Sequence, residues 1–298
     1  MQNFVIAASS TADMPLAYFT QHNIPYLCYT YSIDGADYPD DFFESRSAAE
    51  FYGQIAAGAM PTTSQVNMAG YRAFFEPFLA AGQDMLFLDF PLALSGSYQN
   101  AVLAAQELRE KYPERTLHVV DSLSLSGGQG MLLDAMVDLR NSGASLEEIH
   151  NWLLESRIRL QHWGFTTDLT HLKRGGRISG AAAAIGGALS ICPILVSDDE
   201  GRLLLGKKVR GKRNALREML AMMEKHAENG HSYSGKCFIC HANRPEDANE
   251  LAALITAQFP KTTQPIVVTN IGCVIGSHTG SGTVAFFFWG DKRQKVKG

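Results

Sequence analysis

The chain has 298 residues, 46% of them hydrophobic and 19% charged, with a formal net charge of -4. This is the composition of an ordinary globular protein, long enough for about two domains. The negative charge gives no indication of nucleic-acid binding, and the five cysteines, an odd number, argue against a disulfide framework.

The first half of the chain alternates short apolar runs with segments of helical periodicity. Strands are predicted at 4–9, 26–33, 85–90 and 117–122, and helices at 47–58, 68–82, 97–112 and 130–143. This alternation predicts a mostly parallel sheet with helices on its faces, in which ligands gather at the carboxyl ends of the strands. The first fifteen residues contain neither a basic segment nor a signal-cleavage pattern, so we expect a cytoplasmic protein.

The second half follows a different pattern. A helix over 145–160 is predicted, with Ser145 as N-cap and Glu148 completing a capping box. A hairpin at 194–206, a helix at 214–228 and strands at 236–241, 265–272 and 283–290 follow it. We therefore expect an N-terminal α/β domain over 1–160 and a C-terminal α+β domain over 161–298, with a ligand between them. The cationic end, 291–298, is expected to be a solvated tail.

Two patterns have misleading first interpretations. Ile178–Ser197 contains twenty uncharged residues, but its glycines and Pro193 favour a close-packing helix capped by Ser179, over 180–189, followed by a strand, rather than a membrane span. CFICH, at 237–241, matches a haem-attachment pattern. Because residues three apart on a strand point to opposite faces, we expect two buried thiols there, with neither haem nor metal.

Four segments combine small hydroxyl residues with glycine beside predicted strand ends. They are PTTSQVN (61–67), LALSGSYQN (92–100), DSLSLSGGQG (121–130) and SHTGSG (277–282). Hydroxyl groups and exposed backbone N–H groups suit an anion such as phosphate or carboxylate. None of the four is a phosphate-binding P-loop or a G-x-S-x-G nucleophile elbow.

Taken in order, the motifs of this chain resemble those of the DegV family of bacterial fatty-acid-binding proteins, the acyl-carrying subunits of fatty acid kinases. The resemblance rests on SSTADMP, TTSQVN, LSGSYQNA, VVDSLSLSGGQG, LKRGGRIS, ICPIL, KKVRGKRNAL and HTGSG. The chain departs from the family pattern at Ser9, Val66, Asn67, residues 90–92 and Ser281. These departures leave the identity of the ligand and its presentation to a kinase open.

The resemblance implies that the protein binds a long-chain fatty acid in a buried tunnel and needs no cofactor. It would present the carboxyl group to a dihydroxyacetone-kinase-like, ATP-using partner for acyl-phosphate formation and would not be an enzyme by itself. The hydroxyls of Thr63 and Ser95 would bind the carboxyl group, and Ser64 and Gly96 would offer backbone N–H groups. Two further residues implied to lie near the carboxyl group are Arg177 and His278.

Some of these side chains also have a purely structural interpretation. Thr63 and Ser64 could cap the helix that begins near Asn67. Arg177 could form an ion pair with an acid such as Asp168. Each interpretation predicts a different hydrogen-bond partner in the folded protein.

A second class of function is also open, a serine acyl hydrolase with Ser95 as nucleophile and His278 as base. The chain lacks a nucleophile elbow, and no third orienting group can be assigned. Ser95 could equally be a turn residue, and His278 a structural histidine.

The segment 206–218 contains six cations in thirteen residues. The resemblance implies that this region faces the kinase subunit, with Arg210 and Arg213 as candidates for docking it. A solvated face is the structural alternative. Nucleic acid is not expected as a partner, because no aromatic residues interleave with these charges.

Overall fold

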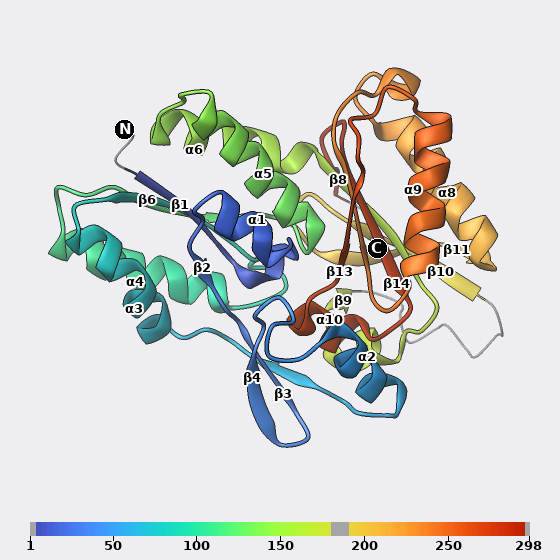
Figure 1. The fold of residues 1–298 in the computed structure, drawn as a ribbon, viewed down its shortest axis with the longest axis horizontal. Helices are drawn as coiled ribbons and strands as arrows, with labels where there is room; N and C mark the ends of the chain where they lie inside the picture. Colours follow the sequence, from blue (N-terminus) through green and yellow to red (C-terminus); the bar gives the residue numbers. More distant parts are fainter. Residues whose placement is uncertain (1–3, 180–190, 296–298) are drawn as a thin grey trace.

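The computed structural model describes residues 4–179 and 191–295 (Figure 1). Its first sheet is parallel throughout, with strand order β2-β1-β6-β7. Its strands are β1 (Phe4–Ser9), β2 (Tyr26–Leu27), β6 (Asp84–Asp89) and β7 (Leu117–Asp121). The helices of this half are α1 (Leu16–Gln21), α2 (Ala48–Ala56), α3 (Met68–Ala80), α4 (Ser97–Lys111), α5 (Gly127–Asn141) and α6 (Leu146–Ser156). The predicted α/β organisation and the Ser145–Glu148 capping box are confirmed.

Alternating side chains of β1 and β6 face two separate apolar cores. Ala7 and Phe87 pack with α3 and α4, whereas Ala8 and Leu88 pack with α5 and α6 on the other side of the sheet. Figure 1 shows these helix pairs on opposite sides of the sheet. The carboxyl ends of the parallel strands are thereby left free to contribute to a binding site.

The single strand predicted at 26–33 is wrong, because the chain leaves the first sheet after Leu27. The Ser10 hydroxyl accepts the N–H of Tyr29 (3.1 Å), and the Tyr29 hydroxyl donates to Asp89 (2.9 Å), which turns the backbone aside. A small antiparallel sheet follows, in the order β4-β3-β5. It contains β3 (Thr30–Ile33), β4 (Ala36–Pro39) and β5 (Thr62–Ser64).

A seven-stranded mixed sheet forms the second half, in the order β13-β12-β14-β8-β10-β11-β9. Its strands are β8 (Leu160–Thr166), β9 (Ile178–Ser179), β10 (Ile191–Ser197), β11 (Leu203–Arg210), β12 (Cys237–His241), β13 (Val267–Asn270) and β14 (Thr283–Trp289). The helices are α7 (Thr170–Gly175), α8 (Lys212–His226), α9 (Pro245–Gln258) and α10 (Cys273–Thr279). Helices α8 and α9 cover one face (Figure 1), and the other face packs against the first half. The predicted α+β organisation and the β10–β11 hairpin are confirmed.

The two thiols of β12 lie in different cores, as predicted. Cys237 packs in the core beneath α8 and α9, and Cys240 packs toward the first half of the molecule. Burial raises the pKa of both thiols, that of Cys240 to about 12. Both cysteines are therefore packing residues, consistent with their alternation along the strand.

The long uncharged segment has strands at both of its ends, β9 and β10. The helix predicted over 180–189 lies outside the described residues. In the described part of the chain, no helix is long and apolar enough to cross a membrane.

The prediction of a solvated carboxyl-terminal tail is wrong at Arg293. Its side chain is only 5% exposed and donates to the Ser197 hydroxyl (3.1 Å) and to the carbonyl oxygen of Leu123 (2.8 Å). Acceptors from both halves of the chain therefore fix this segment, although its composition is typical of a mobile end.

Candidate ligand-binding site

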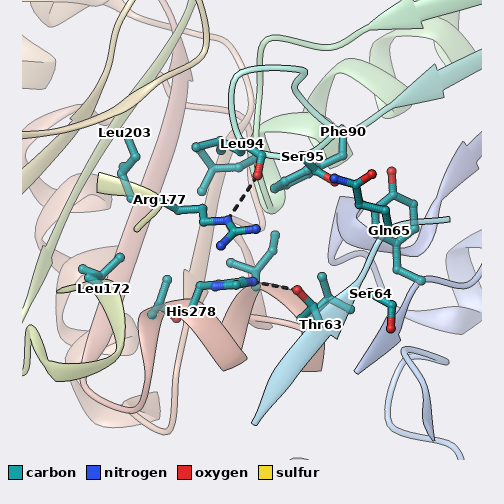
Figure 2. Close-up of a pocket in the computed structure, with 15 residues that line it drawn as sticks. Thr63, Ser64, Gln65, Phe90, Leu94, Ser95, Leu172, Arg177, Leu203 and His278 are labelled. Carbon is teal, nitrogen blue, oxygen red and sulfur yellow. Dashed lines mark hydrogen bonds between the residues drawn. The ribbon is translucent and has the colours of Figure 1, made fainter. Parts of the chain in front are cut away.

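An apolar cavity lies between the two halves of the molecule (Figure 2). The cavity has a volume of about 60 Å³. Its walls come from β5, β11, α7, α10 and the loop before α4. Five of the six residues predicted to bind a carboxyl group line it, namely Thr63, Ser64, Ser95, Arg177 and His278. The sixth, Gly96, directly precedes α4.

Thr63 and His278 meet at this cavity. On β5 the side chain of Thr63 is half-buried whereas those of Thr62 and Ser64 are exposed, as expected for alternating faces of a strand. The Thr63 hydroxyl lies 2.8 Å from His278 Nε2 (Figure 2). The alternative role of Thr63 as a helix cap is wrong, because Asn67 caps α3 by accepting the N–H of Gly70.

Helix α10 holds His278 in place. The Asp40 carboxylate accepts the backbone N–H groups of Cys273 (2.9 Å) and Val274 (3.4 Å), which satisfies two donors at the start of the helix. The Tyr52 hydroxyl donates to the carbonyl oxygen of Ile271 (2.7 Å), just before the helix. Asp40 thus positions the imidazole from the opposite end of the same short helix.

The Gly-Gly-Arg sequence at the end of α7, residues 175–177, explains how the basic side chain reaches the cavity. A β-carbon on Gly175 would lie 2.6 Å from His278 Nδ1, so only glycine allows this close approach. Gly176 has a φ of 64°, which glycine adopts without strain. Arg177 then donates to the carbonyl oxygens of Gly175 and Leu94, the latter at 3.4 Å.

The predicted alternative of an Arg177–Asp168 ion pair is wrong. The Asp168 carboxylate instead accepts the backbone N–H of Thr170 (2.8 Å) at the start of α7. Arg177 forms no ion pair within residues 4–179 and 191–295. Its guanidinium charge therefore has no anionic partner in the described part of the chain.

Ser95 stabilises the turn before α4 and also lines the cavity. Its hydroxyl accepts the N–H of Ser97 (3.2 Å) and donates to the Ser97 hydroxyl (3.0 Å), so the turn interpretation is confirmed. The same residue lines the cavity beside Gln65. A β-carbon on Gly96 would lie 2.7 Å from the Gln65 side chain, so glycine makes room for this amide.

The site carries positive charge around a neutral imidazole. The pKa of His278 is lowered to about 4, mainly by burial, and further by Arg177, Arg174 and His171. The imidazole is therefore neutral near pH 7, and an anion would compensate the surrounding charge. The hydroxyl groups and the guanidinium are donors suited to a carboxylate.

A second cavity lies beside the first, in the second half of the molecule. The two cavities share the lining residues Leu125, Leu203, Ile275 and Thr279. The second cavity has a volume of about 30 Å³. Its walls are largely apolar side chains from β8, β10 and β14. The two cavities are neighbours that share part of their walls, and their apolar lining beside an anion-attracting end suits an amphipathic molecule.

The geometry does not favour the hydrolase interpretation. The hydroxyl of Ser95 is hydrogen-bonded to Ser97, and the Nε2 of His278 is hydrogen-bonded to Thr63. A nucleophile needs a base within hydrogen-bond reach, and no such bond joins Ser95 and His278 within the described residues.

One group of metal-ligand side chains occurs in the described residues, on β7 and α6, and none of its members lines this cavity. Ligand atoms of His118, Glu147 and His150 lie within 4.8 Å of one another. The two imidazole rings are stacked at 3.8 Å with planes 8° apart, and Glu147 lies 2.7 Å from His118. Since lone pairs lie in the ring planes, two parallel stacked rings do not direct them at one ion.

Sequence reasoning missed three residues of the site. Asp40 caps the helix of His278, Gln65 lines the cavity, and Tyr29 joins the cavity wall to the buried Asp89. Gln65 lies within the hydroxyl-rich segment 61–67 and could have been predicted as a site residue from that segment. Asp40 and Tyr29 carry no local signal, because their partners lie far away in the chain.

Fold and site together define a two-part α/β protein with an apolar cavity whose polar end carries donors suited to an anion. The family model described as "Uncharacterised protein, DegV family" matches residues 3–291. A DegV domain-containing protein of Clostridium perfringens is 38% identical over 294 residues, covering 99% of this chain and 100% of that protein. The chain belongs to the DegV family.

Two solved structures resemble the fold closely. A DegV family protein from Thermus thermophilus, described by its fatty acid binding, has a TM-score of 0.84 and 29% identity, covering 98% of this chain and 100% of that chain. A fatty acid binding DegV family protein from Streptococcus agalactiae has a TM-score of 0.82 and 26% identity with the same coverage. The resemblance in sequence to this family is thus confirmed.

Proposed function

We propose that this protein binds a long-chain fatty acid, with the carboxyl group among Thr63, Ser95, Arg177 and His278 and the chain in the two neighbouring cavities. The observation that carries the proposal is the cluster of hydroxyl and imidazole groups at one end of an otherwise apolar space, beside the Arg177 guanidinium, which has no anionic partner among the described residues. A carboxylate would complete this cluster. Ser64 and Gly96 remain proposed donors through their backbone N–H groups.

The energetics of such a ligand agree with this arrangement. A buried carboxylate costs several kcal/mol unless donors surround it, and charge-assisted hydrogen bonds are the strongest donors available. Each buried methylene contributes about 0.8 kcal/mol, so about ten methylenes contribute roughly 8 kcal/mol before the entropy of binding. The apolar walls therefore provide most of the affinity, and the polar end sets the orientation.

The relatives support the same ligand class. The proteins from Thermus thermophilus and Streptococcus agalactiae are both described as binding fatty acids. Their folds cover nearly the whole of this chain. A carrier rather than a hydrolase is further favoured because Ser95 and His278 have separate hydrogen-bond partners.

Denaturing extraction of the purified protein, followed by lipid mass spectrometry, tests the proposal. We expect about one free fatty acid for each chain. The double variant Thr63→Val, Ser95→Ala should lose this lipid while its circular dichroism is unchanged. Protein that neither carries a fatty acid nor takes one up after complete delipidation would contradict the proposal.

We further propose that the bound carboxyl group is presented to an ATP-using, dihydroxyacetone-kinase-like fatty acid kinase subunit in the cytoplasm. Arg210 and Arg213 are exposed, and neither forms an ion pair within the described residues. Arg210 lines an open surface pocket with Lys207, Arg217 and Glu218; although Lys207 pairs with Glu218, the lining carries a net positive charge. Such a surface suits an acidic or nucleotide-bearing partner. No cofactor of the carrier itself is required.

Reconstitution with a fatty acid kinase subunit tests this second step. The double variant Arg210→Ala, Arg213→Ala should retain its fatty acid but form acyl phosphate at least tenfold more slowly at limiting carrier concentration. Lys261→Ala, which removes an exposed cation elsewhere, is the matched control. Equal rates for the double variant and the control would contradict this docking surface.

A further inference from the structure

One wall of the second cavity is formed by β8 and β14. Gly164 lies opposite Ala285, and His162 lies opposite Phe287, on these neighbouring strands. All four residues line the cavity. Gly164 and Ala285 have little bulk, so an apolar chain can pass over them. The aromatic pair next to them on the two strands has ring centroids 5.2 Å apart and planes at 81°.

His162 is a polar residue in this apolar end. It is only 4% exposed, and neither ring nitrogen has a hydrogen-bond partner within the described residues. Burial, with a contribution from Arg293, holds its pKa well below the ordinary value, so the ring is neutral near pH 7. A neutral imidazole has one N–H donor and one acceptor nitrogen, and leaving both unpaired in an apolar interior is unfavourable.

Neighbouring polar groups of the cavity have other partners. The Ser197 hydroxyl accepts from Arg293, the Ser126 hydroxyl donates to Asp13, and the Thr279 hydroxyl donates to the carbonyl oxygen of Gly280. The hydroxyl of Thr283 is also without a partner among the described residues, but it lies four residues from Phe287 on β14, near the shared part of the cavities. Among the described residues that line this cavity, His162 is thus the unpaired ring, with both nitrogens lacking a partner.

We propose that His162 recognises an oxygen substituent on the acyl chain, so that the preferred ligands of this protein are long-chain hydroxy fatty acids. This inference rests on the proposed function, because it assigns the second cavity to the chain of the bound fatty acid. A chain hydroxyl can donate to the free imidazole nitrogen or accept from the N–H group. An unsubstituted chain leaves both nitrogens unpaired.

Competitive titration of the delipidated full-length protein tests the inference. The probes are stearic acid and a series of hydroxystearic acids that carry the hydroxyl at successive positions along the chain. We expect one narrow range of positions to bind roughly tenfold more tightly than stearic acid, the effect of about one additional buried hydrogen bond. Hydroxyls at other positions should weaken binding, because they are buried without a partner.

Two variants show whether His162 is responsible. His162→Phe keeps an aromatic ring but removes both nitrogens, so the positional preference should disappear while stearic acid binds at least as well as before. Thr283→Val removes the other unpaired polar group of the cavity and should leave the preference intact.

The possible outcomes separate this inference from the proposed function. If the wild-type protein binds stearic acid and no hydroxystearic acid binds better, the inference is overturned and fatty-acid binding stands. A preference that persists in His162→Phe also overturns it. If the protein binds neither stearic acid nor any hydroxystearic acid, the proposed function fails as well.

Discussion

Thr63 Oγ1 and His278 Nε2 lie 2.8 Å apart although 215 residues separate them in the chain. Their hydrogen bond joins a short strand of the first half to a short helix of the second half. The same two side chains line the polar end of the cavity. A ligand that binds here therefore contacts both halves of the molecule and should stabilise their association.

Replacement of Thr63 by valine tests the role of its hydroxyl in binding the carboxyl group. Valine keeps the size and branching of threonine, so β5 should form normally. We expect fatty-acid affinity to fall at least about tenfold, since a hydrogen bond to a charged group is lost. Thr62→Val, on the exposed face of the same strand, is the control for Kd measurements. Equal Kd values for the two variants would be inconsistent with the proposed role.

Gly175→Ala should displace the imidazole of His278. The added β-carbon would lie 2.6 Å from Nδ1, and one of the two groups must move. We expect fatty-acid affinity to fall roughly tenfold, with the protein still folded. Gly53→Ala is the matched control, because a β-carbon there meets nothing within 4 Å. Unchanged binding in Gly175→Ala would show that the position of the ring is unimportant.

Asp40 acts on the site through α10 and should not contact the ligand. Asp40→Ala leaves two backbone N–H groups at the start of the helix without an acceptor, and the loss of such a cap costs about 1 kcal/mol. We expect a lower Tm and weaker fatty-acid binding. Asp40→Asn keeps one acceptor oxygen and should recover part of both, whereas Asp37→Ala, on the exposed β4, should change neither.

The titration of His278 should be visible in the stability of the delipidated protein. Its pKa in the folded protein, about 4, lies below the ordinary value of 6.5, so the unfolded chain binds more protons between these pH values. The free energy of unfolding should therefore fall as the pH is lowered from 6.5 to 4. The total loss from this one residue is roughly 3 kcal/mol.

Urea unfolding of wild type and His278→Gln across this pH range isolates the contribution of His278, because all other titrating groups are common to both. The wild type should lose more stability toward acid than the variant. Bound fatty acid should reduce that loss, since its carboxylate favours the protonated imidazole. Parallel stability curves for the two proteins would contradict the lowered pKa.

The fold was predictable wherever one element shows a regular pattern. The alternation of apolar runs and amphipathic helices identified the parallel sheet, and Ser145 with Glu148 identified the start of α6. The strand predicted at 26–33 was wrong because the bonds that break it, to Ser10 and Asp89, come from distant parts of the chain. Periodicity does not report such long-range bonds.

The site was predictable from motif resemblance and only partly from physical patterns. Thr63, Ser95, Arg177 and His278 are brought together at one cavity, although nothing local in the sequence requires it. Asp40 was missed because its role depends on a helix more than two hundred residues away. The buried Arg293 was taken for part of a solvated tail because charge composition alone does not reveal a tertiary partner.

A crystal structure of the protein with a saturated long-chain fatty acid would show where the carboxyl group and the acyl chain bind. We expect a carboxylate within hydrogen-bond distance of Thr63, Ser95 and His278, with the chain extending over Gly164 into the second cavity. A carboxylate at the His162 end, or a fatty acid bound outside the two cavities, would contradict this expectation.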